Sequence, residues 1–439
     1  PHGVPEHTMS WKLISLILVA LVLAAVSASG IYRLVTPEST TDFDGFYRFG
    51  RAALDGTDIY ADKAGQRYLP AFALFMALFA WMPYKAAGIV FIGLNNIALI
   101  VVAWASARLA FAGRAATDPP ATDRPEKVRR TAWNIDLVAP SLLAAIFIAG
   151  NIFLCQVNLP VLALGLLGVL WIAEERPLRG AVSLALAVAL KVTPAIFLPY
   201  LLFRGKVRAF GLTVCCLLTL VFVPSFLVFG VDRTGNYCSR WIDANLAGTD
   251  TTGPDLQRST RYNNQSLLAT ATRLLTATNA ASSKSPRFVN IVSLSPSEFR
   301  LTFIALSILI ALVTLGVWWR ARLRPRDMIG PEAAFTWTVA LLFSPISWTH
   351  HFIAVLPAMY VLWGEIRGGG ADTRMKRIAL WIVILAELCF LTVFFSEPRM
   401  YGSLTLGAVI MAVGMALVLS RSQTPPPGPG RTTPCVPLC

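Results

Sequence analysis

Residues 11–30 read WKLISLILVALVLAAVSASG, and TDFDGFY follows at residues 41–47. An apolar run of about 20 residues has the length that an α-helix needs to cross a bilayer. The second stretch places two carboxylates, Asp42 and Asp44, just beyond that run, where water still reaches them. The two stretches together predict a first membrane span followed by an acidic polar loop. A cleavable signal peptide is the alternative interpretation of the first run, because small residues follow its apolar part.

The rest of the chain continues the apolar pattern. Of its 439 residues, 55% are hydrophobic and 14% are charged, whereas about 25% are charged in an average soluble domain. Apolar blocks of about 12–25 residues recur along the chain, as in membrane spans. We therefore predict an all-α polytopic membrane protein with about 12 crossings and both ends cytoplasmic. Residues 1–8 form a leading segment, 9–420 the transmembrane domain, and 421–439 a disordered, Pro-rich cytoplasmic tail.

The net charge of +14 does not indicate nucleic-acid binding, because the basic residues are concentrated between apolar blocks. Five short stretches hold 19 Lys and Arg against 7 acids, namely residues 108–130, 174–179, 204–208, 320–327 and 367–377. Basic residues gather in the cytoplasmic loops of membrane proteins. This distribution predicts that the loop carrying Asp42 and Asp44 lies outside the cell.

The first outer loop contains a predicted amphipathic helix that begins at Asp42 and ends before Gly56. Its apolar residues lie on one face, which we expect to rest in the lipid interface; they are Phe43, Phe46, Tyr47 and Leu54. Residues 68–83 are apolar but too few to cross easily, so we predict that they enter the membrane and return. Residues 86–111 then make the crossing to the basic loop.

Whereas the cytoplasmic side carries mainly solvated Arg and Lys, varied polar side chains gather at the predicted outer turns. They are Asp42, Asp44, Gln156, Asn158, Lys191, Asn264, Gln265, Trp348, His350 and His351. Lys191 precedes Pro194, where a helix must break, and a cation at such a break suits a phosphate group. The asymmetry predicts one active face, outside the membrane.

Each of these residues also has a purely structural interpretation. Asp42 can serve only as a helix N-cap, and Lys191 can extend its ammonium group to the interface. Gln156 and Asn158 can form a turn, and the two histidines can satisfy backbone groups. The seven cysteines show no metal-ligand spacing, so we predict no metal site.

Four stretches, in this order along the chain, resemble the polyprenyl-phosphate-mannose-dependent α-mannosyltransferases of the GT-C superfamily, which include the mycobacterial phosphatidylinositol-mannoside α-1,2-mannosyltransferases. They are residues 42–47 with 54–60, residues 156–158, residues 190–194, and residues 264–267 with 344–351. Tyr68-Leu69-Pro70 departs from the resemblance, since the family usually has Tyr-Pro-Pro there.

This resemblance implies a GT-C fold and an inverting mannosyl transfer, α-1,2 in linkage, at the extracytoplasmic face of the plasma membrane. The donor would be polyprenyl-phosphate-mannose, and the acceptor a phosphatidylinositol mannoside or lipomannan-type glycolipid. Asp42 would act as general base, although Asp44 is close enough to be the alternative. Lys191 and one or both histidines, with His350 slightly favoured over His351, would stabilise the leaving phosphate without a metal or cofactor.

The remaining predicted site residues would bind substrate; they are Asp44, Gln156, Asn158, Asn264, Gln265 and Trp348. Two further functions stay open from the sequence. One is a GT-C enzyme that uses another polyprenyl-phosphate sugar, such as arabinose or glucose. The other is a lipid or sugar transporter, although the sequence shows no internal repeat of the kind that many transporters contain.

Overall fold

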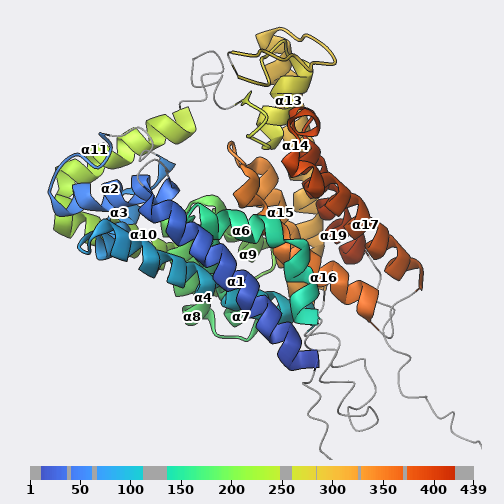
Figure 1. Ribbon diagram of the computed structural model, residues 1–439, viewed down its shortest axis with the longest axis horizontal. Coiled ribbons are helices and arrows are strands. Elements are labelled where there is room, and N and C mark those ends of the chain that lie inside the picture. Colours follow the sequence, from blue (N-terminus) through green and yellow to red (C-terminus); the bar gives the residue numbers. More distant parts are fainter. Residues whose placement is uncertain are drawn as a thin grey trace, which may run out of the picture.

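The computed structural model describes residues 11–36, 41–61, 67–111, 136–247, 260–282, 284–324, 328–368 and 373–420. The predicted leading segment 1–8 and the predicted tail 421–439 lie outside these ranges. Within them the protein is helical, and β pairing is limited to isolated bridges at Asn279–Phe288 and Ser282–Ser285. The all-α prediction is therefore confirmed (Figure 1).

The helices follow one another with short connections. The first part of the chain forms α1 (Trp11–Val35), α2 (Asp42–Leu54), α3 (Pro70–Ala80), α4 (Tyr84–Phe111), α6 (Ala145–Phe153), α7 (Asn158–Ala173), α8 (Pro177–Leu190), η2 (Thr193–Ile196) and α9 (Phe197–Phe203). The second part forms α10 (Val207–Phe229), α11 (Val231–Ile242), η3 (Asp243–Ala247), α13 (Leu267–Leu275), α14 (Pro296–Trp319), η4 (Arg320–Leu323), α15 (Ile329–Phe343), η6 (Thr349–Val355), α16 (Leu356–Arg367), α17 (Thr373–Leu391), η7 (Thr392–Phe394), α18 (Ser396–Met400) and α19 (Ser403–Ser420).

Five helices in the described part of the chain are long and apolar enough to cross a membrane. They are α4, α10, α14 with η4, α17 with η7, and α19. A sixth is possible if Asp136–Leu143 and α6, which meet at a bend of 69°, form one broken span. The protein is thus a polytopic membrane protein, but the predicted count of about 12 crossings is not confirmed, because many apolar helices are shorter than a bilayer crossing requires.

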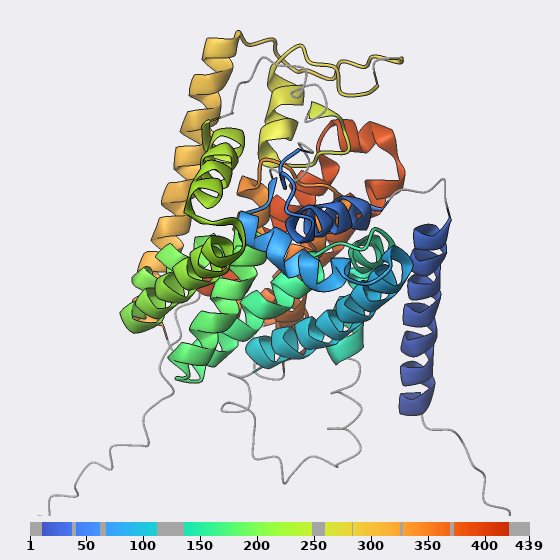
Figure 2. The ribbon, with the colours of Figure 1, turned by 90° about the vertical axis from the view of Figure 1, so that its left-hand side faces the viewer.

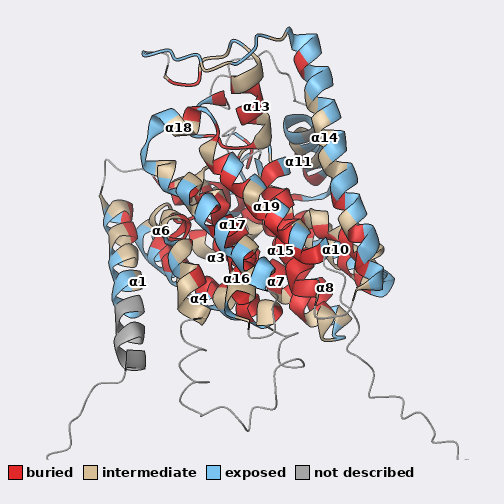
Figure 3. Ribbon diagram, turned by 90° about the vertical axis from the view of Figure 1, so that its right-hand side faces the viewer, coloured by how far each residue is buried: buried red, intermediate tan, exposed pale blue. Residues whose placement is uncertain are grey.

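Helix α14 has exposed apolar side chains that are suited to contact with lipid. Its side chains at Leu301, Leu309 and Leu312 are 59–70% exposed, although the helix is apolar beyond its first turns. By contrast, α7, α8 and α15 are largely buried at the centre (Figure 3). Apolar side chains that face outward are stable in hydrocarbon and not in water, so α14 lies at the lipid boundary.

Helix α2 begins at Asp42, as predicted. Thr41, with extended backbone, is the N-cap, and Asp42 is the first helical residue. The alternative interpretation of Asp42 as the helix N-cap is wrong for this reason. At the other end Gly56 adopts a φ of +68°, and the Thr57 N–H donates to the Ala52 carbonyl at 3.0 Å. Such a left-handed glycine ends the helix, as the sequence predicts.

The apolar face of α2 packs against protein instead of lipid, which corrects the prediction that it rests in the interface. Phe43, Phe46 and Phe49 are at most 6% exposed, and the Phe46 ring lies 5.3 Å from that of Phe72 in α3. A Cβ at Gly50 would lie 2.6 Å from the Met76 backbone, so the two helices approach closely only because this residue is glycine. This packing fixes the position of Asp42 against the bundle.

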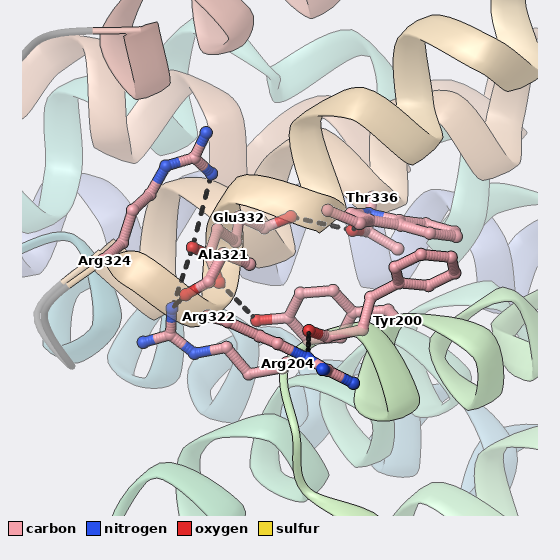
Figure 4. A network of polar contacts seen from close by, with 9 residues as sticks. Tyr200, Arg204, Ala321, Arg322, Arg324, Glu332 and Thr336 are labelled. Carbon is pink, nitrogen blue, oxygen red and sulfur yellow. Dashed lines mark hydrogen bonds and ion pairs between the residues drawn. The ribbon is translucent and has the colours of Figure 1, made fainter.

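The first turn of α15 is held by a buried ionic network (Figure 4). Glu332 is fully buried, and its Oε2 accepts a hydrogen bond from Tyr200 at 2.7 Å. Its Oε1 lies 3.1 Å from Arg204 and 3.4 Å from Arg324. Removing one partner of such a buried pair costs about 3–5 kcal/mol, because the other charge is left uncompensated. The network therefore anchors α15 at the end opposite to the polar outer turns.

The two ends of the molecule are formed by different helices. The segment around α13 and α18 lies at one end, whereas α8 and the lower part of α4 lie toward the other (Figures 1 and 3). Figure 2 shows α2, in dark blue, above the green α8. The predicted site residues come from α2, from the turns that follow α6, α8 and α15, and from the segment before α13.

Candidate active site

The carboxylate of Asp42 does not cap α2, because Thr41 and Asp44 perform that task. It accepts a hydrogen bond from Nε2 of Gln156, and the Asp42 backbone N–H donates to the Leu154 carbonyl at 3.2 Å. Burial raises the pKa of the Asp42 carboxyl above its ordinary value, although the bond from Gln156 and the nearby charges of Arg67 and Lys191 act in the opposite direction. A raised carboxyl pKa makes a stronger base, which suits proton abstraction.

Asp44 is engaged in holding the fold. Its Oδ2 accepts the backbone N–H of Thr41 at 2.7 Å, and its Oδ1 accepts a hydrogen bond from the Tyr84 hydroxyl. This is a capping arrangement in which the third helical residue reaches back to the N-cap. Of the two acids left open by the sequence, Asp42 thus has the carboxylate that faces Gln156 and the polar groups beyond it.

The turn between α6 and α7 brings Gln156 and Asn158 to the site. Cys155 there has a φ of +53°, an uncommon conformation for a residue other than glycine. Asn158 accepts a hydrogen bond from Lys191 Nζ at 2.6 Å, and its own amide donates to Asn151 at 3.0 Å. Asn158 therefore orients the ammonium group and is itself held by the preceding helix.

Lys191 lies where α8 stops. The helix ends at Leu190, Lys191 is extended, and η2 starts at Thr193 with Pro194 in its first turn. The predicted helix break is confirmed. Burial lowers the pKa of Lys191 to about 8, because the charged ammonium loses its hydration. The ammonium group remains mostly protonated at neutral pH and is available to an anion.

A cavity of about 40 Å³ lies beside Lys191. Its polar lining comes from Asn158, Lys191, Thr193, Ser344 and His351, and the rest is apolar, namely Val161, Leu162, Trp337, Leu341, Ile353 and Ala354. A cavity of this accessible volume has room for at least one water-sized group. A cation beside an apolar lining fits an anion that carries a hydrocarbon chain.

The two histidines occupy different positions. His351 lines the cavity, and its Nδ1 lies 3.1 Å from the Trp348 backbone N–H. His350 is 3% exposed, its carbonyl accepts a hydrogen bond from Asn151 at 2.7 Å, and its Nε2 has no hydrogen-bond partner within the described ranges. The geometry thus favours His351 over the slightly preferred His350 as the histidine that faces Lys191.

Comparison with known proteins assigns the chain to a family. Residues 67–345, more than half of the chain, match glycosyltransferase family 87. The chain belongs to glycosyltransferase family 87. It is therefore a membrane glycosyltransferase, and this finding replaces the transporter alternative that the sequence left open.

Two curated relatives are similar over most of this glycosyltransferase. A polyprenol-phosphate-mannose-dependent alpha-(1-2)-phosphatidylinositol mannoside mannosyltransferase of Mycolicibacterium smegmatis is 26% identical over 376 residues, which cover 81% of this chain and 76% of the relative. A protein of the same name from Mycobacterium tuberculosis is 25% identical over 368 residues, covering 79% and 74%. No solved structure matches the chain. The resemblance stated from the motifs is confirmed at the level of the family.

Asn264 and Gln265 of the glycosyltransferase form hydrogen bonds to backbone groups of neighbouring segments. Each is 1% exposed. Asn264 Oδ1 accepts the backbone N–H of Ser347 at 2.9 Å, and Gln265 Nε2 donates to the Arg399 carbonyl at 2.6 Å. The bond of Asn264 fixes the turn that carries Trp348 and the histidines, whereas the bond of Gln265 holds α18.

Arg67 is a candidate site residue that the sequence analysis did not select. Its guanidinium group lies over the Trp348 ring, 5.5 Å from the ring centre, and the residue is exposed. Its charge acts on both Asp42 and Lys191, which places it beside the site. The sequence could have indicated Arg67 by its position directly before Tyr68-Leu69-Pro70. The sequence analysis treated the rest of this predicted outer loop only as a segment exposed to water.

Proposed function

We propose that this family 87 glycosyltransferase has a GT-C fold and transfers mannose from polyprenyl-phosphate-mannose to a hydroxyl of a glycolipid. The observation that supports this most directly is the pairing of Asp42 with Gln156 beside Lys191, which puts a base near a phosphate-binding cation.

In the proposed step, Asp42 takes the proton of the acceptor hydroxyl as its oxygen attacks the anomeric carbon of mannose. The bond between that carbon and the phosphate oxygen breaks, and its electron pair stays on the phosphate. Attack opposite to the leaving group converts a β-linked mannosyl phosphate into an α-mannoside. Asp42 leaves the reaction protonated and returns its proton to solvent.

The leaving phosphate gains negative charge, and three side chains are available to stabilise it. Lys191 supplies a buried ammonium group, His351 a ring nitrogen at the cavity, and Arg67 a guanidinium group on the exposed side. Fixed donors directed at developing charge lower the activation barrier strongly in a site that excludes water. The apolar lining of the cavity suits the first carbons of the polyprenyl chain, and the mannose lies toward Asp42.

The names of the two relatives support the finer assignment of donor, acceptor and linkage. They indicate a polyprenol-phosphate-mannose donor and a phosphatidylinositol mannoside acceptor. On this basis we propose a phosphatidylinositol mannoside, or a related lipoglycan such as lipomannan, as the acceptor and an α-1,2 linkage for the product. Neither a metal nor a cofactor is needed in this scheme, since amino-acid side chains supply the base and the positive charge.

The proposal is tested with purified protein and radiolabelled donors. We expect mannose to be transferred from polyprenyl-phosphate-mannose to phosphatidylinositol mannoside, with full activity in the presence of a chelator. Transfer from polyprenyl-phosphate-glucose or polyprenyl-phosphate-arabinose alone would refute the mannose assignment. Loss of activity on chelation, restored by added metal, would refute the metal-free scheme.

We also propose that the site faces outward from the plasma membrane, as the 19 Lys and Arg in short loops indicate. Two exposed positions provide the test, Lys284 near α14 and Arg374 in α17. In a variant without the native cysteines, a cysteine at position 284 should react with an impermeant thiol reagent added to intact cells. A cysteine at position 374 should react only after the cells are opened, and the reverse pattern would overturn the orientation.

A further inference from the structure

The turn between α15 and η6 contains a hydrogen-bond arrangement that determines which nitrogen of His351 carries its proton. The ring Nδ1 lies 3.1 Å from the backbone N–H of Trp348 and also 3.1 Å from the carbonyl oxygen of Ile346. A neutral imidazole nitrogen can accept from the first or donate to the second, but cannot do both. The two possibilities correspond to the two tautomers of the ring.

Ser344 distinguishes between them. Its hydroxyl donates to the Ile346 carbonyl at 2.8 Å, so this oxygen already has a donor. If Nδ1 accepts from the Trp348 N–H, both backbone groups are satisfied. If Nδ1 instead carries the proton, the Ile346 carbonyl receives two donors while the Trp348 N–H loses its bond. Buried or partly buried backbone donors are rarely left without a partner.

The proton on the ring is then directed toward the cavity. Nδ1 faces the backbone of the turn, and His351 lines the cavity together with Lys191 and Asn158. Nε2 is the ring nitrogen left for the cavity. Burial lowers the pKa of His351 well below its ordinary value, with Lys191 acting in the same direction, so the ring is neutral and holds a single proton at neutral pH.

We propose that Ser344 is a positioning residue that holds His351 in the tautomer with the proton on Nε2, which makes this histidine a hydrogen-bond donor to an anionic oxygen in the cavity. A neutral donor beside Lys191 avoids placing a second positive charge in a small buried space. It also gains strength as the oxygen becomes more negative, which is the condition for stabilising a transition state. The catalytic use of this donor rests on the proposed function, whereas the tautomer itself does not.

Three variants test the tautomer of His351 separately from its use in catalysis. Ser344→Ala removes the hydroxyl from the Ile346 carbonyl, and Ser344→Thr retains it. Thr193→Val removes a different hydroxyl from the same cavity without touching the Ile346 carbonyl. Nitrogen NMR of protein labelled at histidine distinguishes protonated from unprotonated ring nitrogens, and the four histidines of the chain give few signals. His351→Ala identifies the signals of His351 by their loss.

In the unmodified protein we expect His351 to show a protonated Nε2 and an unprotonated Nδ1. Ser344→Ala should move the population toward a protonated Nδ1, Ser344→Thr should restore the original signals, and Thr193→Val should leave them unchanged. A protonated Nδ1 in the unmodified protein, or unaltered signals in Ser344→Ala, would overturn the proposal.

The same variants report on catalysis through turnover with saturating donor. Ser344→Ala should lower turnover by roughly 10- to 100-fold, less than the 10²–10³-fold that loss of a whole oxyanion donor costs, because part of the population keeps the productive tautomer. Ser344→Thr should restore turnover. If the NMR result holds but no mannose is transferred by the unmodified protein, the tautomer assignment stands and the proposed function fails.

Discussion

Asp42 and Asp44 are two residues apart, yet exchanging each for asparagine should have opposite consequences. Asp42→Asn keeps the size of the side chain and retains an oxygen that can accept from Gln156 Nε2. It removes the group that takes the proton. Loss of a general base lowers turnover by about 10²–10⁴-fold, so we expect a folded, nearly inactive protein that still binds donor.

Asp44→Asn should reduce stability more than turnover. The carboxylate accepts from the Thr41 N–H and the Tyr84 hydroxyl through its two oxygens, and an amide keeps only one acceptor oxygen. One of the two donors then loses its partner, which costs about 1–3 kcal/mol. Because Tyr84 is only half-buried, water replaces part of that bond and the cost lies toward the lower value.

Asp55→Asn, at the C-cap of the same helix, is the matched control. Asp55 pairs with Arg51 at 2.6 Å, but both side chains are about half exposed, at 48% and 45%. Exposed pairs contribute about 0–1 kcal/mol, so this variant should match the unmodified protein in both measurements. The assays are single-turnover mannose transfer and thermal inactivation in detergent. An inactive Asp44→Asn beside an active Asp42→Asn would refute the assignment of the base.

The other predictions concern charge in the site. Activity should be bell-shaped in pH: it falls on the acid side as Asp42 becomes protonated through its raised pKa, and on the alkaline side as Lys191 loses its proton near pH 8. Gln156→Ala removes a bond that favours the ionised carboxyl, so the acid limb in a pH–rate profile should move to higher pH, and a shift to lower pH would contradict this reasoning. Arg67→Ala should raise the KM for donor by roughly 10-fold or more with a smaller change in kcat, as for a lost phosphate contact worth about 1.5–3 kcal/mol. The control Arg51→Ala, on the exposed side of α2, should leave KM unchanged, and equal effects of the two variants would show that only net surface charge matters.

Periodicity and turn chemistry predicted much of the fold from the sequence. The helix at residues 42–54, its end at Gly56 and the break after Leu190 all follow from local preferences, and the structure has them. The number of crossings does not follow, because helices such as α7 and α8 are apolar but pack inside the protein. Hydropathy measures how apolar a segment is, and this value is the same for a lipid contact and a protein contact.

The site was predictable in its residue types but not in its partners. The sequence does not distinguish the roles of Asp42 and Asp44. Only the structure shows that Tyr84, 40 residues away, donates a hydrogen bond to Asp44 and so gives it a structural role. His350 and His351 are likewise adjacent, and only the structure shows that His351 lines the cavity. Arg67 was missed because a single arginine in a polar loop carries no periodic signal. Its role depends on Trp348, which is distant in sequence.

The buried anchor at Glu332 affects how substrates leave. Twelve residues separate it from Ser344, about 18 Å along the axis of α15. Tyr200 and two arginines hold Glu332 in place, so α15 cannot slide or tilt without exposing an unpaired buried charge. The turn with His351 at its other end is therefore attached to a firmly held helix. In the proposed reaction, the dissociation rate of polyprenyl phosphate should respond to changes at exposed Arg67, which lies over the Trp348 ring of this turn, more than to changes within α15.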